Sequence, residues 1–211
     1  MSMRKTKEEA ENTREDLLKA AALVFSDKGV ARSTLAEIAK AAGVTRGAIY
    51  WHFENKAEIF DALHDRMHQP FMDTLIEALK DRDTDPLNQL CDLWIKIFCE
   101  LGEDEHRKQG LILFMGKTDY SGELEAYKDK HLKKFEESMQ LFRDYFKAMK
   151  EMGKLPNALD HELIIEGMFC YMKGILLEFL DNPEKFDLQN KIPTLIQWFF
   201  KSIEMIANEM K

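Results

Sequence analysis

The sequence predicts an all-α fold. Apolar residues recur at helical spacing through most of the 211 residues. Capping residues and glycines mark where individual helices start and stop. No stretch shows the strict apolar and polar alternation of a half-buried strand. We expect two domains, a head of three helices over residues 1–54 and a helical bundle over residues 55–211.

The first helix is expected to run to Lys28. Thr6 and Glu9 have the spacing of a capping box, and Gly29 follows the last apolar turn as a stop signal. Residues 1–5 precede it as a mobile basic arm, which either touches phosphate or is a solvated tail.

The stretch TLAEIAKAAGVTRGAIYWHF, residues 34–53, predicts two short helices joined by a tight turn. Thr34 and Glu37 form a second capping box. Gly43 ends the helix, because a left-handed residue is cheap only without a Cβ. Thr45 is then the N-cap of the next helix. This order and spacing are those of a helix-turn-helix.

The second of these helices has two distinct faces. Ile49 and Phe53 share one face and are expected to pack inward. The outward side carries Thr45, Arg46, Gly47, Tyr50 and Trp51. A bare glycine among polar and aromatic side chains suits a helix pressed into a DNA groove. The alternative is a helical hairpin inside a core, with other helices covering the aromatic residues.

The N-terminal stretch RKTKEEAENTREDLLKAAALVFSDKGVARSTLAEIAKAAGVTRGAIYWHFENKAEIF resembles the DNA-binding domain of TetR-family transcriptional regulators. Within it, GVTRGAIYWHFENKAEIF is similar to the recognition-helix signature of the AcrR/TtgR-like branch, which represses multidrug efflux pumps. The resemblance implies a helix-turn-helix DNA-binding domain over residues 1–54 and a ligand-binding and dimerisation domain over residues 55–211. It also implies a homodimer, a palindromic double-stranded DNA operator, and a small hydrophobic or amphipathic effector that releases the repressor.

The motif and the resemblance together define the residues expected to contact DNA. The resemblance places Tyr50, His52 and Lys56 at phosphate-contact positions. Arg46 reads a guanine edge or contacts phosphate, and the sequence leaves both open. The full set of DNA-binding candidates is Thr34, Thr45, Arg46, Gly47, Tyr50, Trp51, His52 and Lys56.

A fourth helix is expected from Asn55, with Glu58 three residues on, to about Leu79. Pro70 lies inside it and should kink it, which makes this residue a candidate hinge. The resemblance makes this helix the lever between head and body. After a loop at 81–86, further helices are expected over 87–101, 105–115, 122–152, 161–180 and 189–210.

The body is rich in Met and Phe residues. Most of them must be ordinary core, although such an interior can repack around varied apolar guests. The resemblance places a ligand cavity among the body helices. Its lining would comprise Met67, His68, Leu93, Trp94, Ile97, Leu111, Met115, Phe135, Phe169, Met172 and Leu176.

The last helix carries a wide apolar stripe that needs more cover than one neighbour supplies. We expect it to form a four-helix bundle with a second copy of the chain. The alternative is an intramolecular core. The dimer-interface candidates are Ile175, Phe179, Leu180, Ile196, Phe199, Phe200 and Ile203.

Charge is distributed unevenly along the chain. Residues 1–56 hold 10 basic and 8 acidic residues, whereas the rest hold 20 and 30, so the net charge of −8 divides into +2 and −10. A locally basic end on an acidic body is compatible with DNA contact by one face. Three cysteines inside apolar helical patterns suit a reducing cytosol. We expect a cytoplasmic protein without a membrane span, since no signal peptide or long apolar run is visible.

No enzyme, metal or cofactor signature is recognisable in the sequence. His64 and His68 have metal-ligand spacing on one helix, but no third ligand is identifiable, so we expect neither a metal nor a cofactor. We expect no enzymatic activity, because no catalytic motif is present. Two alternatives stay open: a carrier or sensor of small hydrophobic molecules without specific DNA binding, and a helical enzyme.

Overall fold

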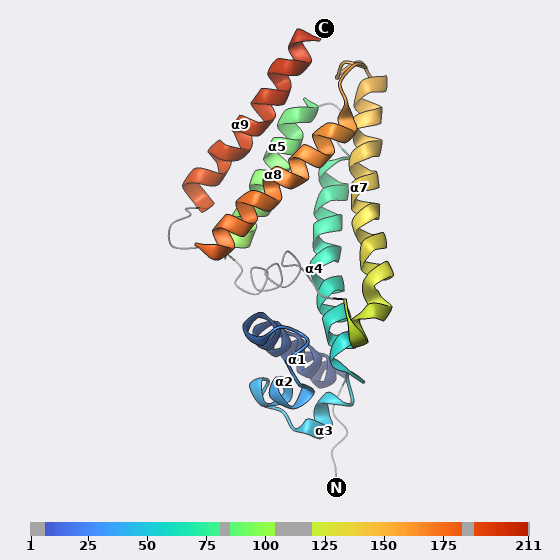
Figure 1. Ribbon diagram of the computed structural model, residues 1–211, viewed down its shortest axis with the longest axis vertical. Helices are drawn as coiled ribbons and strands as arrows, with labels where there is room; N and C mark the ends of the chain where they lie inside the picture. Colours follow the sequence, from blue (N-terminus) through green and yellow to red (C-terminus); the bar gives the residue numbers. More distant parts are fainter. Residues whose placement is uncertain (1–6, 81–84, 104–119, 183–187, 211) are drawn as a thin grey trace. The chain divides into compact units, whose positions relative to one another are not determined.

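The computed structural model describes residues 7–80, 85–103, 120–182 and 188–210 (Figure 1). Every regular element among these residues is helical, as the sequence predicted, and none of them is a strand. The elements are α1 (Lys7–Lys28), α2 (Leu35–Ala41), α3 (Arg46–Ile49), α4 (Lys56–Ala78), α5 (Pro86–Glu103), the 3-10 helix η1 (Gly122–Tyr127), α7 (Lys128–Glu151), α8 (His161–Asp181) and α9 (Leu188–Glu209). The helix expected over 105–115, Thr6 and the N-terminal arm lie outside the described residues.

The chain forms two compact units. The first comprises Met1–His68 and His106–His131, and the second comprises Gln69–Glu105 and Leu132–Lys211. The functional division expected at residues 54 and 55 falls inside the first unit. Long-range contacts explain this, because the start of α7 packs on the first half of α4. Its Lys130 ammonium lies 2.6 Å from the Asp61 carboxylate.

Local sequence signals set the boundaries of α2 and α3. The Thr34 hydroxyl accepts from the Glu37 amide at 3.2 Å, and the Thr34 amide donates to the Glu37 carboxylate at 2.9 Å. Gly43 has φ +68°, the left-handed conformation that the predicted turn requires. Thr45 caps α3 by accepting from the Ala48 amide at 3.2 Å. The capping box, glycine turn and N-cap predicted for this stretch are therefore confirmed.

A continuous apolar core fixes α3 in the first unit. Ile49 and Phe53 are 0% and 2% exposed, as predicted for the inward face. They pack in one cluster with Leu17 and Phe25 of α1 and Ile38 of α2. Fully burying one such side chain contributes about 1.5–3 kcal/mol. This core, more than the intrinsic preference of a four-residue helix, holds α3 in place.

The N-terminus of α4 is capped as expected, with one difference in the partner. The Glu58 amide donates to Asn55 Oδ1 at 2.8 Å. The Glu58 carboxylate reaches back to the Glu54 amide at 2.7 Å instead of to Asn55. Farther along, Pro70 lies inside the helix, and the Thr74 hydroxyl donates to the Pro70 carbonyl at 2.9 Å. Both features weaken the backbone hydrogen bonding of α4 around Pro70.

In the second unit, α9 runs alongside α5 and also contacts α8 (Figure 1). The Tyr171 hydroxyl of α8 donates to the Leu195 carbonyl of α9 at 3.0 Å, and the Tyr171 ring stacks on Phe199. The single helix expected over 122–152 is instead divided into η1 and α7. Gly122 begins this segment at φ +59°, which a regular α-helix does not allow. No helix in the described ranges is long and apolar enough to cross a membrane.

Candidate nucleic-acid interface and apolar interior

The outward face of α3 is open to solvent. Thr45, Arg46 and Gly47 are exposed, and no other part of the described chain covers them. Tyr50 and Trp51, in the turn that follows α3, are 51% and 89% exposed. A tryptophan this exposed costs solubility and stabilises nothing in its own chain. The arrangement fits a surface that meets a partner, and it argues against the hairpin buried in a core.

Gly47 has no conformational or packing role inside the protein. Its backbone has an ordinary negative φ, and an added Cβ would lie 4.0 Å from its nearest neighbour, Thr45 Oγ1. A glycine within a helix costs about 1 kcal/mol relative to alanine. The fold therefore gains nothing from the absence of a side chain at Gly47. A partner that approaches the backbone closely would require that absence.

Like Thr45 at the N-cap of α3, Thr34 and Lys56 make hydrogen bonds within the chain. The Thr34 hydroxyl is exposed, but it forms the α2 capping box. The Lys56 ammonium donates to the Ala31 carbonyl at 2.7 Å and to the Ser33 carbonyl at 3.4 Å. His52 is half-buried beside the open face. The exposed candidates on α3, its N-cap and the turn after it are Thr45, Arg46, Gly47, Tyr50 and Trp51.

An ion pair joins the last residue of α1 to the first turn of α2. The Lys28 ammonium lies 2.6 Å from the Glu37 carboxylate. This hydrogen bond lowers the pKa of Glu37 and raises the pKa of Lys28. Both groups therefore stay charged at neutral pH. Their pairing limits the repulsion that an isolated carboxylate would exert on a polyanion.

A polar cluster joins α4 to the start of α7 in the first unit. The Asp61 carboxylate accepts from Lys130 and from His131 Nε2 at 3.1 Å, and Tyr120 bonds His131 Nδ1 at 2.9 Å. Burial lowers the pKa of His131, against the opposing effect of its bond to Asp61. Burial alone would raise the pKa of Asp61, but the bonds from Lys130 and His131 lower it. His64 stacks on His131 with ring centroids 3.8 Å apart. No group of three or more potential metal ligands occurs within the described ranges.

Aromatic side chains of α5, α7 and α8 contact one another in the second unit. Trp94 stacks parallel to Phe142 at 6.3 Å and meets Phe169 edge-on at 5.7 Å. Phe135, which is 54% exposed, meets Phe169 edge-on with the ring centroids 5.9 Å apart. The Trp94 indole N–H points at the Met168 sulfur, 3.1 Å away. Three of the predicted lining residues, Trp94, Phe135 and Phe169, are thus brought together.

The remaining lining candidates differ in their surroundings. Leu93, Met172 and Leu176 are buried, and Ile97 is half-buried. Met67 and His68 belong to the first unit. Leu111 and Met115 lie outside the described residues. The resemblance missed Phe142 and Met168 as members of the aromatic group, although both belong to the Met- and Phe-rich pattern of the body.

Most of the predicted dimer-interface residues are buried within the single chain. Ile175, Phe179, Ile196, Phe200 and Ile203 are at most 7% exposed within the single chain. Within the chain, α9 packs on α5 and α8. The role of these residues in a dimer stays a prediction. Leu180 and Phe199 are half-buried.

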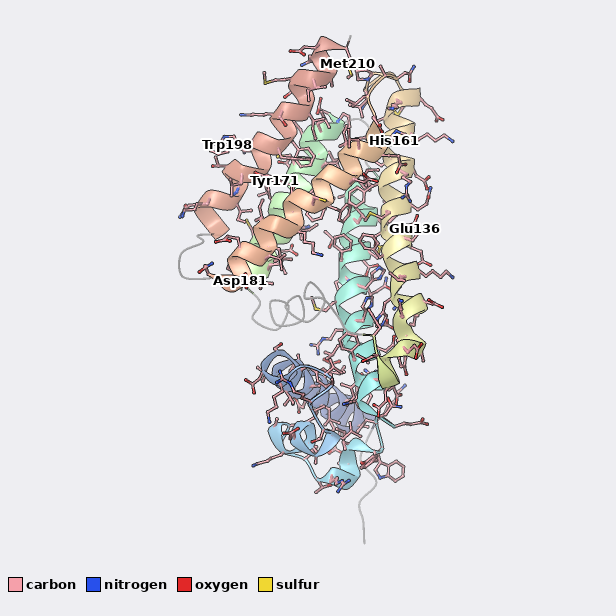
Figure 2. The ribbon with its side chains drawn as sticks, in the orientation of Figure 1. Glu136, His161, Tyr171, Asp181, Trp198 and Met210 are labelled. Carbon is pink, nitrogen blue, oxygen red and sulfur yellow. The ribbon has the colours of Figure 1, made fainter. Side chains whose placement is uncertain are left out.

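A different set of α8 and α9 residues is exposed. Leu163 and Leu177 of α8 are 65% and 36% exposed, and Cys170 between them is also exposed. Trp198 and Met205 of α9 are 64% and 67% exposed, and Figure 2 shows Trp198 at the outer edge of its helix. On each helix, the seven-residue spacing places its exposed side chains on one face of that helix, as in helix-bundle interfaces. We call these five residues the outer stripe.

Comparison with known proteins agrees with both parts of the chain. The family model for bacterial regulatory proteins of the tetR family matches residues 17–63. The model for the C-terminal region of MAATS-type transcriptional repressors matches residues 85–206. The HTH-type transcriptional regulator TtgR of Pseudomonas putida is 34% identical over 205 residues, covering 97% of this chain and 96% of TtgR.

Solved structures show the same fold. The SmeT–triclosan complex has a TM-score of 0.76 and 30% identity, covering 90% of this chain and 91% of SmeT, the repressor of a Stenotrophomonas maltophilia multidrug efflux pump. NalD of Pseudomonas aeruginosa, the secondary repressor of the MexAB-OprM pump, has a TM-score of 0.78 and 29% identity, covering 91% of this chain and 96% of NalD. With its exposed α3 face, helical body and full-length match to such regulators, the chain belongs to the TetR family of transcriptional regulators.

Proposed function

We propose that the protein is a repressor that binds a palindromic operator as a homodimer and is released by a small hydrophobic or amphipathic effector. We further propose that it controls a multidrug efflux operon, as the names of SmeT and NalD state for those relatives. The observation that carries the proposal is the open face of α3, built around Gly47 and held from behind by Ile49 and Phe53.

On this proposal, the two α3 helices of a dimer enter successive major grooves, about 34–36 Å apart or wider. Gly47 lets the backbone approach the DNA. Arg46 and Tyr50 contact base edges or phosphates, and Thr45 and Trp51 flank them. The first 56 residues carry a small positive balance while the remainder is acidic, which favours this end of the chain for a polyanion.

The effector would bind in the second unit, near the aromatic group around Trp94. Stacked and edge-on rings suit a planar apolar guest, and the related SmeT is solved with triclosan. An effector shifts DNA binding only by its differential affinity for the two conformers. A tenfold loss of operator affinity requires about 1.4 kcal/mol of such difference.

Dimerisation would use the outer stripe. Its apolar residues stand at heptad spacing on α8 and α9, the two helices whose inner faces are already packed. Burying these exposed side chains against their copies supplies the cover that the sequence led us to expect. We expect the protein to act in the cytoplasm, without a membrane, a cofactor or an enzymatic reaction.

Fluorescence anisotropy tests the proposal. The probe is a fluorescein-labelled duplex carrying a site selected from a random library on the wild-type protein. We expect affinity to fall steeply with salt, because phosphate contacts release counterions, and to fall further when triclosan is added. Binding without salt dependence would remove the basis for phosphate contacts.

The alternative is a carrier or sensor of hydrophobic molecules that does not read DNA. The Arg46→Ala variant separates the two functions, since Arg46 is exposed and distant in sequence from the aromatic group. A regulator loses operator affinity and keeps its ligand affinity. Unchanged DNA affinity with intact ligand binding would favour the carrier.

A further inference from the structure

The indole N–H of Trp94 is a buried donor whose acceptor is a thioether. Trp94 is 6% exposed, and its Nε1 lies 3.1 Å from Sδ of Met168, a residue that is 0% exposed. An indole N–H can only donate, and a thioether sulfur is a weak acceptor compared with an oxygen. The fold therefore satisfies this buried donor with a weak hydrogen bond.

Aromatic rings surround the same indole. The ring centroids of Phe71, Phe98, Phe142 and Phe169 lie between 5.7 and 6.4 Å from the Trp94 centroid. These rings come from α4, α5, α7 and α8, and all of them belong to the second unit. One donor among apolar rings is the usual composition of a small-molecule site, in which a few polar groups orient the ligand.

The rings around Trp94 become more exposed toward one side. Phe142 is 0% exposed, Phe169 is half-buried, and Phe135, which meets Phe169 edge-on, is 54% exposed. This gradient gives an apolar guest a side from which to approach the indole. Methionine is unbranched and adapts its shape easily, so the Met168 sulfur can withdraw when a better acceptor arrives.

A second polar group of this unit contacts a sulfur, but it has an oxygen acceptor as well. The Ser138 hydroxyl lies 3.1 Å from Met72 Sδ and 3.2 Å from the Lys134 carbonyl. Exchanging the sulfur for a ligand oxygen would give this hydroxyl little, because it can already donate to an oxygen. The Trp94 N–H gains a stronger bond when an oxygen takes the place of the Met168 sulfur.

We propose that the Trp94 indole N–H is the specificity-determining donor of the effector site. It selects flat aromatic effectors that carry an acceptor oxygen over hydrocarbons of the same shape, and the ligand oxygen takes the place of the Met168 sulfur. The inference rests on the proposed effector site and deepens it, because it names the chemistry that the site prefers.

Calorimetry with two matched probes tests the inference. One probe, 2-acetylnaphthalene, carries a carbonyl oxygen, and the other, 2-isopropenylnaphthalene, has a methylene group in its place. The ratio of their dissociation constants is compared between proteins, because the hydration of the free probes cancels in that comparison. Trp94→Phe keeps an aromatic ring and removes the N–H. We expect it to reduce the preference for the acetyl probe about fivefold, the effect of one neutral hydrogen bond.

Met168→Leu should change the ratio in the opposite direction. Leucine has a similar volume but offers no acceptor, so the N–H loses its internal partner and the preference for the acetyl probe should rise above that of wild type. A loss of packing alone would weaken both probes together and leave the ratio unchanged. Met168→Leu also keeps the inference testable if Trp94→Phe does not fold. Ser138→Ala, which removes the other hydroxyl-to-sulfur contact, is the matched control and should leave the ratio unchanged.

An unchanged ratio in Trp94→Phe or in Met168→Leu, or an equal drop in Ser138→Ala, overturns the inference. The anisotropy of the selected duplex with each probe and wild-type protein separates this failure from that of the proposed function. If neither probe binds, or neither lowers operator affinity, the proposed effector site around Trp94 fails and the inference fails with it. If the probes bind and release the operator while the variants keep the wild-type ratio, only the inference fails.

Discussion

The Gly47→Ala variant should be more stable than wild type but should bind DNA more weakly. The added Cβ would lie 4.0 Å from Thr45 Oγ1, an ordinary contact, and no positive φ stands in its way. Replacing a helical glycine by alanine stabilises by about 0.5–1 kcal/mol, which for a chain of this size raises Tm by roughly 1–4 °C. The same methyl group would stand where the DNA backbone or a base edge must approach. Overpacking a close interface costs about 1–3 kcal/mol, or roughly 5- to 150-fold in operator affinity.

Differential scanning fluorimetry and duplex anisotropy measure the two effects on one preparation. Gly43→Ala is the matched contrast, because Gly43 has φ +68° and an alanine there is strained by about 1–2 kcal/mol. The Tm of Gly43→Ala should lie below that of wild type, whereas the Tm of Gly47→Ala should lie above it. A Gly47→Ala variant that binds the operator as tightly as wild type would refute the close approach of α3 to DNA.

Three further predictions concern the rest of the molecule. The charge introduced by Trp198→Glu or Met205→Glu, at 64% and 67% exposed positions, should leave the fold intact and dissociate the dimer in light scattering. Because burial holds the pKa of His131 below 6.5, the unfolded chain binds more protons. Stability is therefore complete above pH 6.5 and should fall as pH drops from 6.5 towards the folded pKa, by at most about 1.4 kcal/mol per unit; melting curves of wild type and His131→Gln should show this loss only in wild type. Trp94→Ala should cost about 3–5 kcal/mol of unfolding free energy, measured with urea, because it empties the centre of the aromatic group.

The first unit could be predicted well because its signals are local. A capping box spans four residues, and Gly43 and Thr45 act on their immediate neighbours. The inward positions of Ile49 and Phe53 follow from helical spacing alone. Such features depend on short-range chemistry, so the sequence displays them directly.

The contacts that depend on distant partners could not be predicted. Apolar periodicity marked α9 as an interface helix, but it could not show that Ile196 and Phe200 are buried within the chain while Trp198 stays exposed. The carbonyl partners of Lys56 lie 23 and 25 residues away, and His131 meets Asp61 across 70 residues. Spacing rules reach about two helical turns, and beyond that only the fold decides which groups meet.

Hydrogen exchange of the operator complex tests the central claim most directly, since it shows which backbone meets DNA. Peptides spanning residues 45–53 are compared with and without the selected duplex, using a random-sequence duplex as the control. The account predicts that exchange slows strongly in this segment with the selected duplex and less with the random one. Protection confined to the second unit, with residues 45–53 unchanged, would contradict it.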